Sequence, residues 1–236
     1  MKPYILGAIF ARGGSKGLPK KNIRDLAGKP LIAYAIETGK EILSIDRLIV
    51  STDDEEIAKV AKEYGAQVPF MRPKELATDD SPELLSWQQA IKAIEAESKD
   101  KVDVLVVIPT TSPLREAEDL QNCLDALLNS DADIVVAVKE AERNPYFNML
   151  TLDKDGYANL PIADKGAFTH RQLAPKVYDM TTIAYVARAA YILETPSVLA
   201  GKVKTVIVPR ERAIDIDDMM DFEIAEFLMK KRRNSK

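Results

Sequence analysis

Short apolar runs rich in β-branched residues alternate with segments of helical periodicity, and this alternation limits the fold more than any other feature of the chain. We expect strands at residues 5–10, 48–51, 68–71, 102–108, 134–138, 182–186 and 203–208. Helical patterns occupy residues 31–43, 55–64, 82–96, 117–128 and 219–231. Strands that alternate with helices predict an α/β fold, with a doubly wound, mostly parallel sheet covered by helices on both faces.

The chain has the size and composition of one domain. Its 236 residues are 46% hydrophobic and 30% charged, which provides enough apolar material for one substantial core. We therefore interpret residues 1–236 as a single domain. Residues 139–179 interrupt the periodicity and contain the turn sequence Asp153-Lys154-Asp155-Gly156. We expect an inserted β-hairpin here, the arm, with residues 150–152 and 157–160 flanking the turn; a surface excursion without a function is the alternative.

A loop rich in glycine and basic residues directly follows the first predicted strand. It spans residues 11–22 and contains Arg12, Gly13, Gly14, Lys16, Gly17, Lys20 and Lys21. Glycine lets backbone N–H groups approach an anion closely, and the basic side chains supply counter-charge. The glycine spacing matches neither a Walker A loop nor a dinucleotide-binding fingerprint. Because open α/β sheets bind ligands at the carboxyl ends of their strands, we interpret it as another kind of polyphosphate-binding loop; a basic surface loop is the alternative.

The overall charge and the rare residue types exclude several functions. A net charge of −4 argues against broad binding of nucleic acid or anionic membranes, so the basic loop suits a small anion. One cysteine cannot form an intramolecular disulfide, and the sequence shows neither a secretory h-region nor an apolar run long enough to span a bilayer. We therefore expect a cytoplasmic protein with no nucleic-acid or membrane partner.

The single cysteine and the single histidine also limit the chemistry. Cys123 shares a helical face with Leu120, Leu124 and Leu127, so we expect it in the core rather than as a nucleophile. With His170 as the only histidine, a histidine-based metal cluster or a Ser-His-Asp triad is not expected. Any bound metal should be a hard cation with oxygen ligands.

Two carboxylates near the C-terminus are candidate ligands for such a cation. In an extended chain Asp215 and Asp217 point to the same face, while Ile214 and Ile216 point into the core. The two carboxylates would repel each other without a divalent cation, and Mg²⁺ is typically held by one or two carboxylates together with phosphate oxygens. We predict that they bind Mg²⁺ or Mn²⁺. The alternative is that Asp217 or Asp218 caps the following helix, in which Asp221 is a first-turn residue.

The loop and the carboxylates together define a reaction class. Basic side chains neutralise a triphosphate, a divalent cation bridges its oxygens, and a nucleophile held in line attacks one phosphorus. Attack at the α-phosphorus releases pyrophosphate and leaves a nucleotide on the acceptor. The predicted catalytic residues are Arg12, Lys16, Lys21, Asp215 and Asp217.

Residues 11–34, which fit A-R-G-G-S-K-G-L-P-x-K-N-I-x-x-L-x-G-K-P-L-I-A-Y, closely resemble the opening of the bacterial CMP-sialic acid synthetases, or acylneuraminate cytidylyltransferases. The resemblance implies a Rossmann-like nucleotidyltransferase fold and CTP as the nucleotide. Residues 214–222 match the family's metal-binding motif I-D-I-D-x-x-x-D-F. The family's loop wraps the CTP phosphates and base, which assigns nucleotide binding to Arg12, Gly13, Gly14, Ser15, Lys16, Lys21 and Asn22.

The resemblance also suggests where the base and the sugar bind. Arg72 and Ser81 stand at positions similar to those that contact cytosine, although Ser81 also resembles a helix N-cap before Pro82. Arg171 begins a segment similar to R-Q-D-x-P-x-x-Y and could pair with the carboxylate of an acid sugar, and Tyr185 ends a second sugar-binding segment. In the family the arm mediates dimerisation, so we expect a homodimer in which Arg171 reaches the neighbouring site. A surface arginine is the alternative.

Departures from the family concentrate at the sugar positions. Pro109 replaces the glutamine of Q-P-T-S-P-L-R, residues 181–185 replace N-G-A-I-Y, and Leu173 replaces an aspartate. We therefore expect a cytidylyltransferase for a nonulosonic acid that need not be N-acetylneuraminate, such as legionaminate. A nucleotidyltransferase for 3-deoxy-manno-octulosonate, one that uses another nucleotide, and a regulator that binds without catalysis are the alternatives.

Overall fold

A six-stranded mixed sheet forms the centre of the computed structural model, which describes residues 2–14, 17–162, 168 and 170–234. Its strands, in spatial order, are β10 (Val203–Ile207), β6 (Ile134–Glu140), β9 (Tyr178–Arg188), β5 (Val104–Val107), β1 (Ile5–Phe10) and β4 (Arg47–Ser51). The β1–β4, β1–β5 and β10–β6 pairs are parallel, and β9 runs antiparallel to both neighbours. The predicted α/β fold with a mostly parallel sheet is confirmed.

Two details of the sheet differ from the prediction. Residues 68–71 form no strand: isolated bridges beside β4 join Gln67 to Ile49 and Met71 to Thr52, and Pro69 between them has no N–H to donate to a ladder. Strand β9 is antiparallel because the chain returns from the arm directly beside β6, without the crossover helix that a parallel connection needs.

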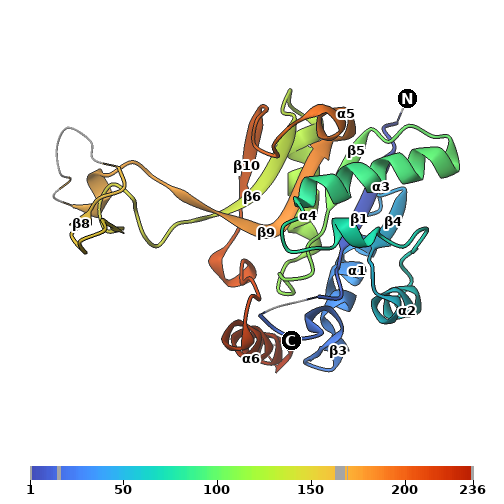
Figure 1. The fold of residues 1–236 in the computed structure, drawn as a ribbon, viewed down its shortest axis with the longest axis horizontal. Coiled ribbons are helices and arrows are strands. Elements are labelled where there is room, and N and C mark those ends of the chain that lie inside the picture. Colours follow the sequence, from blue (N-terminus) through green and yellow to red (C-terminus); the bar gives the residue numbers. More distant parts are fainter. Residues whose placement is uncertain (1, 15–16, 163–167, 169, 235–236) are drawn as a thin grey trace.

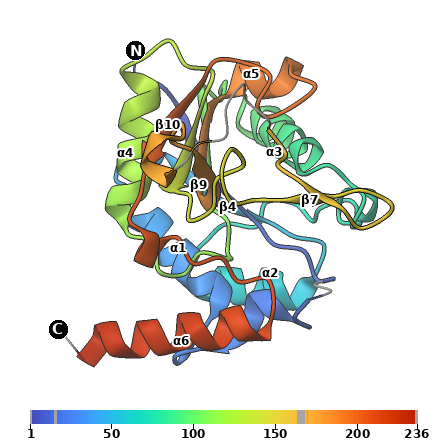
Figure 2. The ribbon, with the colours of Figure 1, turned by 90° about the vertical axis from the view of Figure 1, so that its left-hand side faces the viewer.

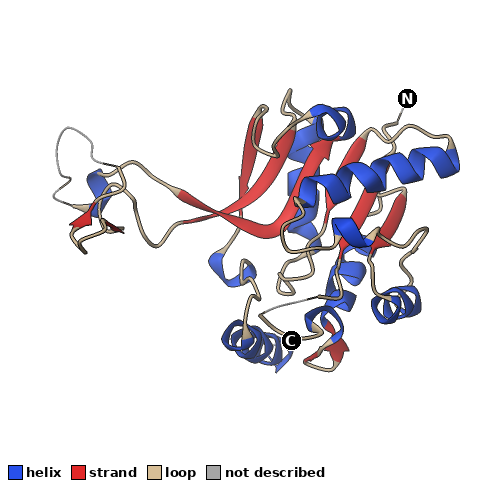
Figure 3. Ribbon diagram, in the orientation of Figure 1, coloured by secondary structure: helices blue, strands red, loops and turns tan. Residues whose placement is uncertain are grey.

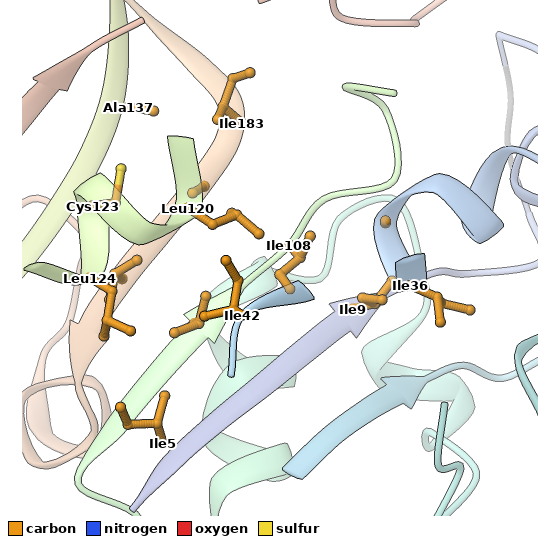
Figure 4. Packing of buried hydrophobic residues seen from close by; sticks show 14 of the residues in the cluster. Ile5, Ile9, Ile36, Ile42, Ile108, Leu120, Cys123, Leu124, Ala137 and Ile183 are labelled. Carbon is orange, nitrogen blue, oxygen red and sulfur yellow. The ribbon is translucent and has the colours of Figure 1, made fainter. Parts of the chain in front are cut away.

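Helices cover both faces of the sheet. On one face lie α1 (Leu31–Glu41), α2 (Glu55–Glu63) and α4 (Ala117–Leu128), and on the other lie α3 (Glu83–Ser98) and the short α5 (Ala189–Glu194). Figure 2 shows α4 and α3 on opposite sides of the strands. Cys123 is fully buried between α4 and the sheet (Figure 4), and this burial raises its pKa to about 12, so it is a core residue.

The last helix, α6 (Met219–Asn234), packs away from the sheet. It covers the start of α1 and the small hairpin of β2 (Asp25–Leu26) and β3 (Lys29–Pro30). Phe222, Ala225 and Met229 of α6 are buried there against Leu18 and Tyr34. This packing brings the acidic segment that precedes α6 to the N-terminal loop.

The arm projects from the body of the molecule (Figures 1 and 3). Strands β6 and β9 continue beyond the sheet as a two-stranded ribbon that ends in the hairpin of β7 (Thr151–Leu152) and β8 (Ala158–Asn159). Asp153 Oδ1 accepts hydrogen bonds from the backbone N–H groups of Asp155 and Tyr157, and Gly156 adopts a φ of 87° that closes the turn. The 3₁₀-helix η3 (Arg171–Leu173) lies in the returning limb. Within the described part of the chain, no helix has the length and apolarity needed to cross a membrane.

Candidate active site

Three loops meet at the carboxyl ends of the parallel strands β1, β4 and β5, where α/β sheets bind ligands. They are the glycine-rich loop after β1, the segment 109–115 after β5, and the acidic segment 213–218 before α6. A fourth contribution comes from Asp53 and Asp54 after β4. Gly13 N donates a 3.0 Å hydrogen bond to Asp53 Oδ1, and a Cβ on Gly13 would lie 2.6 Å from Asp54 Oδ2. A side chain at position 13 would therefore have to displace the Asp54 side chain, which caps α2.

The side chain of Asn22 links the glycine-rich loop to the segment after β5 through two hydrogen bonds. Its Nδ2 donates to the carbonyl of Arg12 at 3.0 Å, and its Oδ1 accepts from Thr110 Oγ1 at 2.6 Å. Both polar atoms of the buried Asn22 side-chain amide therefore have hydrogen-bond partners within the protein. The geometry supports a role in positioning Arg12, while direct contact with a nucleotide stays a prediction. The predictions for Ser15 and Lys16 concern residues outside the described part of the chain.

Arg12, Arg72 and Ser81 line one pocket of about 280 Å³, although they come from three separate segments. Arg12 forms a 2.7 Å ion pair with Asp79, which also lines the pocket. Arg72 is buried, donates to Ser51 Oγ and Ser51 O at 3.1 and 2.5 Å, and lies 5.5 Å from the centre of the Phe10 ring. Burial lowers the pKa of Arg72 to about 10, while nearby carboxylates oppose the change.

Ser81 does not cap α3, contrary to the alternative interpretation of this residue. The N-cap position is Pro82, and no side chain makes a capping hydrogen bond there. The buried Oγ of Ser81 has no hydrogen-bond partner among the described residues. Since a buried hydroxyl normally finds a partner, this atom is free to bond a ligand in the pocket.

The acidic segment is fastened to both other loops by its backbone. Ile216 N donates to Thr111 O at 2.9 Å, and Lys21 Nζ donates to Ile216 O at 2.6 Å. The Ile216 side chain is fully buried. Gly17 approaches the backbone carbonyl of Asp217 so closely that a Cβ would collide with it. The predicted phosphate loop and the predicted metal carboxylates therefore lie side by side.

Among the described residues, the side chains of Asp215 and Asp217 take no part in capping α6. Asp218 and Asp221 perform the capping of α6, because Asp221 Oδ2 accepts from the N–H groups of Asp217 and Asp218, and Asp218 Oδ1 accepts from Asp221 N. Capping through the Asp217 side chain is therefore wrong. Asp215 Oδ1 is buried without a hydrogen-bond partner in the described structure, an environment that suits a metal ligand.

The environments of the two carboxylates are not equivalent. The segment is irregular rather than an extended strand, and Asp217 is exposed while Asp215 is partly buried. Among the described residues, no three His, Cys, Asp or Glu side chains cluster as a complete metal site. A cation here would therefore need oxygen ligands from a phosphate or water, as Mg²⁺ commonly does.

Arg115 is a site residue that the sequence did not reveal. The guanidinium is buried and donates to the carbonyls of Pro109 and Thr182, the latter at 3.2 Å. Burial lowers the pKa of Arg115 to about 9, and the charges of Asp119 and Asp215 oppose that change. Arg115 thus holds the segment after β5 against β9 and places a positive charge near Asp215.

The two predicted sugar residues lie in different parts of the molecule. Tyr185, on β9, packs 5.4 Å from Trp87 between ring centres. Burial, together with the charges of Glu83 and Asp215, raises the pKa of Tyr185 to about 12, so the phenol lies near the acidic segment. Arg171 belongs to η3 in the arm, which projects away from this site (Figure 1), and its side chain is outside the described structure.

Comparison with known proteins agrees with this geometry. Residues 6–228 match the model of a family described as cytidylyltransferase. The chain is 35% identical to the post-translational flagellin modification protein B of Campylobacter coli, over 97% of this chain and 96% of that protein. It is also 35% identical to the CMP-N,N'-diacetyllegionaminic acid synthase of Campylobacter jejuni, covering 95% and 94% of the two chains. A solved structure of CMP:2-keto-3-deoxy-manno-octonic acid synthetase complexed with CTP shares the fold, with a TM-score of 0.68, 15% identity, and coverage of 97% and 99%.

Proposed function

The chain belongs to the cytidylyltransferase family, and on that premise we propose that it transfers CMP from CTP to the anomeric hydroxyl of a nonulosonic acid and releases pyrophosphate. The observation that supports this proposal most directly is the junction between the glycine-rich loop and the acidic segment. It consists of the Lys21–Ile216 hydrogen bond and the close approach of Gly17 to Asp217. This junction supports the proposal, because it brings the basic side chain of Lys21 beside the segment that carries Asp215 and Asp217. A protein that only binds a sugar nucleotide has no use for such an arrangement.

Different residues are assigned to the cytosine base and to the triphosphate of CTP. Arg72, Ser81 and the pocket that they line suit the cytosine base, because a guanidinium and a hydroxyl offer donors to its carbonyl oxygen. Arg12 and Lys16 are assigned to the triphosphate, where their charges stabilise the developing negative charge on the leaving pyrophosphate. Arg12 would have to exchange its ion pair with Asp79 for a phosphate oxygen.

The reaction is an in-line displacement. The anomeric hydroxyl oxygen attacks the α-phosphorus, the bond to the oxygen bridging the α- and β-phosphorus atoms breaks, and the hydroxyl proton passes to solvent. Asp215 and Asp217 would hold Mg²⁺ or Mn²⁺, which neutralises phosphate charge and makes a bound hydroxyl more acidic. Arg115 holds the segment after β5 against Thr182 of β9 and supplies a positive charge near Asp215.

The acceptor that we favour is a di-N-acylated acid such as N,N'-diacetyllegionaminate. The support is the name of the Campylobacter jejuni relative and the departures from the sialic acid pattern at Pro109, Leu173 and residues 181–185. We further propose a homodimer in which the arm carries Arg171 to the partner's acceptor site. Exposed Leu150, Leu152 and Tyr157 give the arm an apolar surface for such an interface. Its use of CTP and its lone cysteine fit a cytoplasmic enzyme.

The test is to incubate the protein with Mg²⁺, one nucleoside triphosphate at a time and a panel of acid sugars, and to measure pyrophosphate together with the nucleotide sugar. The proposal expects equal amounts of pyrophosphate and CMP-sugar with CTP and a nonulosonic acid. Preference for 3-deoxy-manno-octulosonate or for another triphosphate would support the corresponding alternative enzyme. Binding of CMP-sugar without turnover of any acceptor would indicate a regulator.

A further inference from the structure

Arg212 attaches the beginning of the acidic segment to helix α4. It ends the 3₁₀-helix η4 (Arg210–Arg212), directly before residues 213–218. Its guanidinium forms a 2.8 Å ion pair with Asp119 Oδ1 and a 2.9 Å ion pair with Glu116 Oε2, both at the N-terminal end of α4. The Arg212 side chain is only 21% exposed, and Asp119 is buried. The attachment is therefore largely shielded from water.

Asp119 is itself held firmly by α4. Its Oδ2 accepts a 2.9 Å hydrogen bond from the backbone N–H of Glu116, which is one half of the capping box that starts the helix. The same carboxylate uses its other oxygen to pair with Arg212. Burial raises the pKa of Asp119, and the charges of Arg212 and Arg115 oppose that rise. Because Asp119 is buried, salt screens its pairing with Arg212 much less than it screens an exposed ion pair.

The acidic segment has a second attachment on the other side of Asp215. Ile216 N donates to Thr111 O at 2.9 Å, so Asp215 lies between this hydrogen bond and the Arg212 ion pair. Both attachments end on one continuous stretch of chain, residues 111–119, which leads from β5 into α4. The short link of residues 213–215 between them can span at most about 3.3–3.6 Å for each residue. The two attachments therefore limit where the Asp215 carboxylate can lie.

We propose that Arg212 is a positioning residue for the metal carboxylate Asp215, and that its ion pair with Asp119 determines the affinity of the acidic segment for a divalent cation. The inference rests on the proposed function, because it concerns the cation that the reaction would use. Arg212 acts through the backbone and touches neither the cation nor the substrate. Residues that orient metal ligands in this indirect way typically contribute roughly 10- to 100-fold to metal affinity.

The test measures the dissociation constant of Mn²⁺ by electron paramagnetic resonance on protein without nucleotide, and that of CTP by calorimetry with a chelator present. Arg212→Met should weaken Mn²⁺ binding by roughly 10-fold or more. It should leave CTP binding unchanged, because Arg212 does not line the nucleotide pocket. The matched control is Arg210→Met, since Arg210 lies in the same turn but is 73% exposed and pairs with Glu142 of the arm. The control should bind Mn²⁺ as the native protein does.

A double variant separates positioning from stability. Arg212→Met leaves the buried Asp119 carboxylate without its ion-pair partner and should lower the melting temperature. In Arg212→Met/Asp119→Asn the buried charge is gone, and asparagine can still accept the capping hydrogen bond. The double variant should regain most of the native melting temperature and still bind Mn²⁺ weakly, because the attachment is missing. Recovery of both properties together would mean that Arg212 acts on folding alone, and would overturn the inference.

The remaining outcomes distinguish this inference from the proposed function. Native Mn²⁺ affinity in Arg212→Met, an equal loss of affinity in Arg210→Met, or no Mn²⁺ binding by the native protein would overturn the inference. If the native protein forms the CMP-sugar while Arg212→Met keeps native Mn²⁺ affinity, the proposed function stands and the positioning role fails. If no acid sugar is turned over but Mn²⁺ binding responds as stated, the positioning role stands and the proposed function fails.

Discussion

Lys21 and Ile216 are separated by 195 residues in sequence, yet Lys21 Nζ donates a 2.6 Å hydrogen bond to the backbone carbonyl of Ile216. Ile216 lies between the two predicted metal carboxylates, and Lys21 ends the glycine-rich loop. A hydrogen bond from a charged donor is stronger than one between neutral groups. It therefore fixes the distance between the groups that would hold the triphosphate and the groups that would hold the cation.

Replacing Lys21 with methionine should damage catalysis more than folding. Lys21→Met removes the link to Ile216, and a misplacement of about 1 Å between catalytic groups can cost roughly 100-fold in rate. The matched control is Lys20→Met, since Lys20 pairs with Glu56 on the exposed surface. We expect kcat to fall in Lys21→Met and to remain near the native value in Lys20→Met, with similar melting temperatures. Equal activities in the two variants would contradict the role of the link.

Arg115 should be essential for both stability and turnover. Arg115→Met removes a buried charge near Asp119 and Asp215 and leaves the Pro109 and Thr182 carbonyls without their donor, and a buried acceptor without a partner typically costs about 1–3 kcal/mol in the free energy of unfolding. Arg115→Lys keeps the charge but cannot bond two carbonyls with a planar fork. We expect Arg115→Lys to fold and to lose kcat with little change in KM for CTP, as measured by chemical denaturation and steady-state kinetics. Native kcat in Arg115→Lys would show that only the charge matters.

The roles of Asp215, Asp217 and Asp218 can be separated. Asp215→Asn and Asp217→Asn should abolish pyrophosphate release and weaken Mn²⁺ binding measured by electron paramagnetic resonance, because an amide is a poor ligand for a hard cation. Asp218→Asn should keep both properties, since asparagine also caps helices well. Removal of divalent cations with a chelator should stop the native reaction, and Mg²⁺ should restore it. Near-normal turnover of the first two variants at saturating Mg²⁺ would refute the metal assignment.

The arm can be tested by mixing two inactive variants. Arg171→Ala removes the group that the arm should deliver, and Asp217→Asn disables the nucleotide centre. In a mixed dimer one site combines an intact nucleotide centre with an intact arm from the other subunit, so activity should return after subunit exchange. A protein in which Arg171 serves its own subunit would recover nothing. A monomeric mass at micromolar concentration would refute the arrangement before any mixing.

Local sequence patterns were sufficient to predict most elements of the fold. Apolar, β-branched runs located β1, β5, β6 and β10, of which the first three are almost entirely buried, and helical periodicity located the five longer helices, each of which buries one face. It did not reveal the antiparallel direction of β9, which depends on how the arm returns. It also predicted a strand at residues 68–71 because those residues are apolar, although Pro69 limits their pairing to isolated bridges.

The sequence likewise predicted one part of the candidate site and missed another. Sequence motifs pointed to Arg12, Arg72 and Ser81, and the structure places them in one pocket. The motifs contain Arg115 and Thr182 but did not predict the contact between them, since it joins the segment after β5 to β9, which are far apart in sequence. The available signal for Arg115 was the segment from Thr111 to Arg115, which matches the T-S-P-L-R part of the family motif and follows a buried strand.

The most direct test of the central claim is to follow the anomeric oxygen of the acceptor. A nonulosonic acid labelled with ¹⁸O at its anomeric hydroxyl is incubated with CTP, Mg²⁺ and the protein, and the products are analysed by mass spectrometry and ³¹P NMR. Attack of this hydroxyl on the α-phosphorus predicts that the label appears only in the bridging oxygen of the CMP-sugar and that the pyrophosphate is unlabelled. A CMP-sugar without the label, label in pyrophosphate, or CMP formed by hydrolysis without any CMP-sugar would contradict the proposed transfer.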